Sequence, residues 1–285
     1  MVVSASVVLA GCGGQAAPPG AGGGRPPACP AGAEPAVLAC RINGDVVAVR
    51  DPGASASVLD ELGPRVQQDY RELGDHPEWD AAVLGAVDPG VRDQVGRGVA
   101  AYRDLASLAG PPMPTLPAWR IVDPLPVDQL RGFYDEAQRR FGVRWSVLAA
   151  INLVETRMGR IVGTSSAAAQ GPMQFIPATW ASYGMGGDVW QPRDAIMGAA
   201  NYLAANGGNN DATLDRALRR YNNDVRYVRA VRNYAAMMDA DPRVFAGLHA
   251  WPVEYRTTAG DILLPTGYAS DHPVPVAEWL ASHSR

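Results

Sequence analysis

The sequence predicts a mainly α-helical fold with a short β appendage at the C-terminus. Apolar residues make up 47% of the 285 residues and charged residues 19%, so the chain has enough apolar surface for a packed core. Apolar residues recur mostly at helical spacing from about residue 57 to residue 240, and at a spacing of two after residue 241. The length allows one or two domains. A net charge of −4 argues against a nucleic-acid partner.

The first residues resemble an export signal. Residues 1–11 are apolar and small, and Leu9-Ala10-Gly11-Cys12 resembles the bacterial lipobox, which implies that Cys12 is diacylated and anchors the protein to a membrane. No basic residue precedes the apolar run, so the alternative is a disordered N-terminal tail. We therefore expect a signal with a lipobox over 1–12 and a flexible Gly/Pro/Ala tether over 13–36.

Two further cysteines lie in the segment that would be exported. Cys29 and Cys40 most simply form a disulfide in an oxidising compartment, and the alternative is two free thiols. The four histidines are scattered and no Cys/His metal spacing occurs, so we expect no metal ion and no cofactor.

Residues 37–126 form the predicted N-terminal region. Asn43-Gly44 separates two apolar runs within 37–49, which indicates a β-hairpin. Helices are expected from 57 to 73 and between 77 and 108, and a Pro-rich break at 111–126 is expected to act as a linker.

Residues 127–240 form the predicted catalytic domain. Helices are expected over 127–141 and 143–158, from Pro192 to about Gly207, and in two later segments marked by apolar residues at helical spacing. Residues 241–285 are expected to be a structural appendage with a hairpin around Gly260-Asp261.

Glu155 is a carboxylate next to an apolar helical stripe. Leu148 and Ile151 precede it by seven and four residues, which places all three on one side of the helix. Burial would raise the pKa of this carboxyl, as a general acid working near neutral pH requires. The alternative is a boundary glutamate paired with an arginine such as Arg144.

The chain after this helix carries a family resemblance. Val154 to Trp180 (VETRMGRIVGTSSAAAQGPMQFIPATW), the ANYL of residues 200–203 and Tyr221-Asn222 resemble the bacterial lytic transglycosylases, most closely the membrane-bound B type. The resemblance covers roughly residues 118–240 and implies a lysozyme-like helical domain with Glu155 as the catalytic acid and base. It also implies a glycan groove lined by Ser165, Gln174, Phe175, Tyr202, Tyr221 and Asn222.

Two departures from the family pattern accompany the resemblance. Ala168 stands where the family has Gly, at a cost of about 1 kcal/mol if that position requires a positive φ. The segment 183–192 is short and carries one carboxylate, Asp188, so the calcium loop of some relatives is expected to be absent. Asp188 and Asp194 are expected to cap the loop and the next helix.

The resemblance implies a reaction on the glycan strand of peptidoglycan, outside the cytoplasm. Most glycosidases need two carboxylates, and the motif region offers only Glu155, which favours a substrate-assisted, non-hydrolytic cleavage with 1,6-anhydroMurNAc ends. The alternatives are a hydrolytic muramidase and a noncatalytic peptidoglycan-binding module. A serine hydrolase is disfavoured because GxSxG is missing. We expect a monomer.

Overall fold

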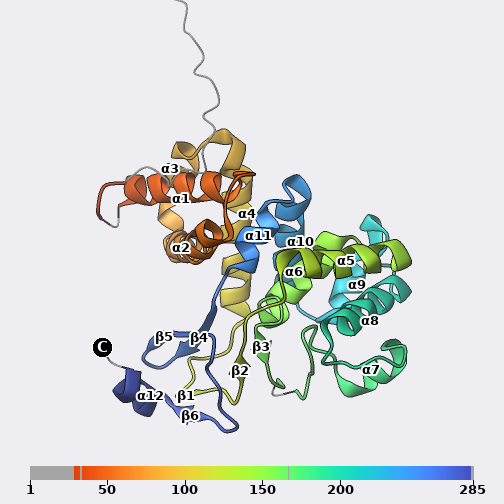
Figure 1. The fold of residues 1–285 in the computed structure, drawn as a ribbon. Coiled ribbons are helices and arrows are strands. Elements are labelled where there is room, and N and C mark those ends of the chain that lie inside the picture. The colour runs from red at the N-terminus through yellow and green to blue at the C-terminus, as the bar shows by residue number, and fades with distance from the viewer. Residues whose placement is uncertain (1–28, 33, 166, 284–285) are drawn as a thin grey trace, which may run out of the picture.

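The structure, a computed structural model, describes residues 29–32, 34–165 and 167–283 (Figure 1). The lipobox with Cys12, most of the predicted tether, and Ser166 lie outside these residues. The expected mainly helical fold with short antiparallel strands near the C-terminus is confirmed. Within the described ranges, no helix has both the length and the apolar character needed to cross a membrane.

The N-terminal region is helical from its start, and the hairpin predicted over 37–49 is wrong. The segment forms α1 (Pro35–Val49), because Leu38, Ile42, Val46 and Val49 share one helical face that is buried. The Asn-Gly pair sits inside this helix, and the Asn43 side chain accepts a hydrogen bond from the backbone N–H of Asp88 at 2.8 Å. A tertiary contact therefore replaces the turn that the local pattern indicated.

The other N-terminal helices follow the predicted spacing closely. They are α2 (Ala56–Asp75), the 3₁₀ helix η1 (Pro77–Trp79), α3 (Asp80–Ala86) and α4 (Pro89–Leu108). A disulfide joins Cys29 to Cys40, with the two Cα atoms 5.9 Å apart. It ties the chain ahead of α1 to the side of that helix.

The C-terminal half of the core consists of seven helices that follow the linker. They are α5 (Val127–Phe141), α6 (Trp145–Thr156), α7 (Pro177–Tyr183), α8 (Pro192–Ala205), α9 (Asp211–Tyr221), α10 (Val225–Ala240) and α11 (Val244–His249). Helix α6 is buried along almost its whole length, and α10 packs against both α6 and α4. One continuous apolar core consequently runs from Leu38 in α1 to Trp251 beyond α11.

Short strands connect the Pro-rich segment with the C-terminal end of the chain. The predicted hairpin is present as β4 (Val253–Thr257) and β5 (Gly260–Leu264), in a register that pairs Thr257 with Gly260. Strand β1 (Thr115–Leu116) pairs with β6 (Val274–Pro275), which leads into α12 (Val276–His283), and β2 (Arg120–Ile121) pairs with β3 (Ile161–Val162). The segment 113–122 thus bridges the loop after α6 and the C-terminal strands, as Figure 1 shows below the helices.

Candidate active site

Glu155 lies in the last turn of α6, where this buried helix approaches the surface. Its carboxylate is part-buried and accepts a hydrogen bond from the hydroxyl of Tyr227 on α10, with 2.7 Å between the two oxygens. Burial raises the pKa of Glu155 from its ordinary 4.5 to about 7, and the bond from Tyr227 opposes this rise. The carboxyl is therefore poised to donate and recover a proton near neutral pH.

Arg144, the alternative partner considered for Glu155, is engaged elsewhere. Its guanidinium pairs with Asp239 and, at 3.0 Å, with Asp211. Burial and the phenol of Tyr227 are the causes of the shifted pKa of Glu155, and no second carboxylate from the described ranges contributes to it. Among the described residues, Glu155 is therefore an isolated carboxyl, and its hydrogen-bond donor, the hydroxyl of Tyr227, is neutral.

A buried polar network fixes the loop that follows α6. The side chains of Asn152 and Thr156 both donate to the backbone carbonyl of Pro172, at 2.8 and 2.6 Å. Asn152 in turn accepts from the hydroxyl of Tyr134 at 2.6 Å. Buried polar groups are stabilising only when they are paired in this way, and here the pairs hold the returning loop against the helix that carries Glu155.

The loop itself has several residues in the left-handed backbone region. Ala168 has φ of 58° and Gln174 has φ of 50°, so the position where the family has Gly does carry a positive φ here. Gly171 also has a positive φ, and a Cβ at this residue would lie 1.9 Å from the Val189 carbonyl oxygen, which no side chain permits. Two backbone hydrogen bonds between Gln170 and Phe175 close the turn, with nitrogen–oxygen distances of 2.9 and 2.8 Å.

Ser165 and Gln174 are both tied to the loop backbone. The Ser165 hydroxyl oxygen accepts from the N–H groups of Ala167 and Ala169 at 3.2 and 3.1 Å, which leaves its own proton available for a ligand. The Gln174 amide donates to the carbonyl of Gly171 at 3.0 Å and keeps its oxygen for other partners. Both side chains are part-exposed.

An aromatic cluster supports the wall beside this loop. Phe175 is only 3% exposed and packs edge-on against Trp180 and Tyr221, so it belongs to the core, contrary to the expectation that it lines the groove. Tyr221 donates its hydroxyl to the Met173 carbonyl at 2.6 Å and stacks with Tyr227, the partner of Glu155. These rings hold Tyr227 in place.

Tyr202 and Asn222 lie next to this cluster. Tyr202 packs edge-on against Tyr221 and donates its hydroxyl to the Arg220 carbonyl at 2.7 Å. Asn222 is the residue after α9, and its backbone N–H bonds to the Leu218 carbonyl. Both residues are part-exposed.

Sequence reasoning missed Tyr227, Asn152 and Thr156. Tyr227 is 72 residues from Glu155, and no local pattern distinguishes it from its neighbours on the buried face of α10. Asn152 did carry a signal, because it is a polar residue within the apolar run of α6. Such a residue in a buried helix requires a hydrogen-bond partner.

The two aspartates of the segment after α7 serve as backbone caps. Asp188 accepts from the N–H of Trp190 at 2.9 Å, and Asp194 accepts from the N–H of Asp188 at 3.0 Å. Across the described part of the chain, no group of three or more His, Cys, Asp or Glu side chains could hold a metal ion.

Comparison with known proteins bears on the same part of the chain. No curated protein and no solved structure matches it significantly. A protein-family model does match: residues 133–241 align with the transglycosylase SLT domain. The matched range includes Glu155, the loop after α6 and Tyr227. This match supports a lysozyme-like transglycosylase domain over residues 133–241.

Proposed function

We propose that the protein cleaves the β-1,4 bond between MurNAc and GlcNAc in peptidoglycan, with Glu155 as its single acid and base. The observation that carries this proposal is the state of Glu155: a part-buried carboxyl with a pKa of about 7, bonded to a phenol and not to a cation. The match of residues 133–241 to the transglycosylase SLT domain supports the same activity in general.

The proposed reaction begins with protonated Glu155. It gives its proton to the glycosidic oxygen while the N-acetyl carbonyl of MurNAc attacks the anomeric carbon of the same sugar, so the leaving sugar departs with a hydroxyl. Glu155 is then ionised, and it takes the proton from the C6 hydroxyl as that oxygen displaces the acetamido group and closes a 1,6-anhydro ring. Tethering makes this hydroxyl far more effective than a free reactant.

Tyr227 is a positioning residue in this scheme. Burial and the neighbouring Glu155 raise the pKa of its hydroxyl well above the ordinary value, so it stays protonated and keeps donating to the carboxylate. This bond stabilises the ionised form that must exist between the two proton transfers. The hydroxyl of Ser165 and the amide oxygen of Gln174 are the groups we propose for orienting the acetamido group.

The proposed setting is the cell envelope. The disulfide between Cys29 and Cys40 is typical of an oxidising compartment. We further propose that acylated Cys12 anchors the protein to the membrane. A Cys12→Ala variant that leaves the membrane fraction while still cleaving soluble glycan supports this anchor, whereas an unmodified mass for the native protein excludes it.

Glu155→Gln tests the proposed function with Glu278→Gln as its matched control. Glu278 undergoes the same chemical change at an exposed position on α12. General acid–base catalysis contributes about 10²- to 10⁴-fold, so Glu155→Gln should clear purified sacculi at least about a hundredfold more slowly. The control should match the wild type. Unchanged clearance by folded Glu155→Gln, or no clearance by the wild type, would refute the proposal.

A further inference from the structure

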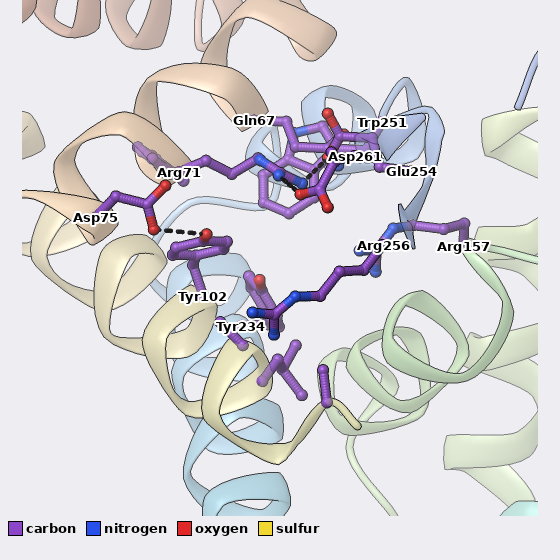
Figure 2. A pocket seen from close by; sticks show the side chains of 15 residues that line it. Gln67, Arg71, Asp75, Tyr102, Arg157, Tyr234, Trp251, Glu254, Arg256 and Asp261 are labelled. Atoms are coloured by element: carbon purple, nitrogen blue, oxygen red, sulfur yellow. Dashed lines mark hydrogen bonds and ion pairs between the residues drawn. The ribbon is translucent and has the colours of Figure 1, made fainter. Parts of the chain in front are cut away.

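A cavity of about 570 Å³ lies among the N-terminal helices, the end of α6, α10 and the β4–β5 hairpin. This volume is within the range of small-ligand pockets. Figure 2 shows Arg157 and Arg256 on the side of the cavity away from Asp75 and Tyr102, and Arg256 pairs with Asp261 in the register of the β4–β5 hairpin. Glu155 is not among the residues that line it. The cavity is therefore a feature separate from the catalytic carboxyl.

The acids of this cavity are already paired. Arg71 forms ion pairs with both Glu254 and Asp261, and Gln67 donates to Glu254 at 3.0 Å. Asp75 accepts from the hydroxyl of Tyr102 at 2.9 Å. Of the three carboxylates in the lining, two therefore share Arg71 and the third bonds to a phenol.

The two other arginines of the lining have no ion pair among the described residues, although Arg256 stands across from Asp261 in the hairpin. Arg157 donates one N–H to the Leu153 carbonyl at 3.0 Å, and burial lowers the pKa of its guanidinium. Neither Arg157 nor Arg256 forms an ion pair with any residue that the structure describes. A part-buried guanidinium has five donors, and most of those on Arg157 remain for a ligand.

Two further polar atoms of the lining residues have no partner. The side-chain oxygen of Gln67 and the indole N–H of Trp251 are buried, and neither forms a hydrogen bond within the described ranges. Their residues are 4% and 3% exposed. Because both atoms are closed to water, they lie behind the cavity surface, and we assign them no part in ligand binding.

The cavity adjoins the catalytic region through shared elements. Arg157 follows Glu155 by two residues, so their Cα atoms are at most about 7 Å apart. Tyr234, which lines the cavity, lies two turns beyond Tyr227 on α10, or about 10 Å along the helix. At the start of α10, Arg226 donates to the Ser107 carbonyl near the end of α4. The cavity lining and the catalytic carboxyl therefore share α10 and the end of α6.

We propose that this cavity binds the peptide stem of peptidoglycan, with Arg157 and Arg256 receiving a free carboxylate of the stem. The inference rests on the proposed function, because the stem is attached to the MurNAc sugar. Guanidinium groups bind carboxylates through paired hydrogen bonds. The three carboxylates of the same lining would repel a polymer of phosphates, which carries negative charge throughout. Leu105, Ala106 and Ala109 offer apolar contact for alanine side chains.

Arg256→Gln is the variant that tests the proposal, because Arg256 is exposed and does not belong to the catalytic machinery. Arg139→Gln, on the exposed end of α5, is the matched control. In the full chain, calorimetry with a synthetic stem tripeptide should show binding that Arg256→Gln weakens about tenfold, as the loss of a charged hydrogen bond predicts. The affinity of Arg256→Lys for the tripeptide should lie between those of the wild type and Arg256→Gln. A tripeptide with an amidated C-terminus should bind the wild type as weakly as the unmodified tripeptide binds Arg256→Gln.

Kinetics on two glycan substrates separate this inference from the proposed function. Arg256→Gln should raise KM about tenfold on strands that carry stems and leave kcat unchanged, with no effect on strands stripped of stems by an amidase. If KM is the same on strands with and without stems and the tripeptide does not bind, the inference is overturned and the proposed function is unaffected. Tripeptide binding without any cleavage overturns the proposed function alone. Binding of inorganic phosphate in preference to tripeptide overturns the inference in favour of a phosphate ligand.

Discussion

The bond between Tyr227 and Glu155 sets the pH dependence that we predict. The first step needs protonated Glu155, whose pKa is about 7, so kcat/KM should fall as the pH rises through 7. Tyr227 donates to the ionised form and lowers this pKa. Tyr227→Phe should therefore slow the reaction and move the alkaline limb of the profile upward by about one unit.

Rate profiles on soluble glycan between about pH 5 and 9 measure this shift. Tyr221→Phe is the control, since its hydroxyl bonds to the Met173 carbonyl and not to Glu155. It should lower the rate without moving the limb. A limb that stays in place or moves downward in Tyr227→Phe would exclude the assigned role of Tyr227.

The raised pKa of Glu155 also predicts a stability effect. The folded protein holds this proton up to about pH 7, whereas the unfolded chain releases it near 4.5. The folded state therefore loses stability as the pH rises from 4.5 through 7, by up to about 3 kcal/mol. Glu155→Gln removes the buried charge, so the variant should be more stable than the wild type at about pH 8, with a smaller difference near pH 4.5.

Urea unfolding of both proteins at the two pH values measures this difference. Asp45 and Asp69 have pKa values raised to about 6 by burial, so the wild type itself changes with pH, but their contribution cancels between variant and wild type. An equal difference at both pH values would mean that Glu155 titrates like an ordinary surface carboxyl.

Glu155 was predictable from the sequence, but its partner was not. Helical spacing from Leu148 and Ile151 is enough to place the carboxyl beside an apolar stripe. Tyr227 comes from another helix, and only the packing of α10 on α6 brings the two residues together. Phe175 was expected to line the groove, but its ring is buried. A family motif indicates which residues recur, but it does not indicate whether a ring faces the substrate or the core.

At the scale of elements, the loop after α6 is strained at Ala168. This residue is exposed and has φ of 58°, a conformation that is unfavourable for a residue with a Cβ. Ala168→Gly should remove this strain and raise the free energy of unfolding by up to about 1 kcal/mol, partly offset by the greater freedom of Gly in the unfolded chain.

Chemical denaturation of Ala168→Gly checks the effect. Ala181→Gly is the control, because Ala181 is also exposed and lies within helix α7, where φ is negative. It should be neutral or destabilising. A loss of stability in Ala168→Gly as large as in the control would show that position 168 carries no strain in solution.

Helix α1 shows why local patterns fail at some elements. Asn43-Gly44 is a strong hairpin signal by itself, yet the residues around it also satisfy a helical stripe that begins three residues after Pro35. The segment forms a helix and not a hairpin because α2 provides an apolar face against which the stripe packs. Tertiary packing of this kind outweighs the local preference for a turn. Elements for which periodicity and turn signals agree, such as α5 and the β4–β5 hairpin, were predictable within a residue or two.

At the scale of the whole molecule, the N-terminal helices support the site without contributing to its chemistry. The core is continuous from α1 to Trp251, and α4 packs along the helix that carries Tyr227. The sequence indicated helices in this region but no role for them, because their role lies in contacts with α10. The C-terminal hairpin likewise closes the cavity that we assign to the peptide stem.

In the proposed reaction one carboxyl, Glu155, carries out both proton transfers, and no water enters the product. Mass spectrometry of muropeptides released from purified sacculi in H₂¹⁸O tests it most directly. We expect MurNAc ends that are unlabelled and lighter by one water than the hydrated sugar. Hydrated ends that carry the heavy oxygen as the main product would contradict it and make the protein a hydrolytic muramidase.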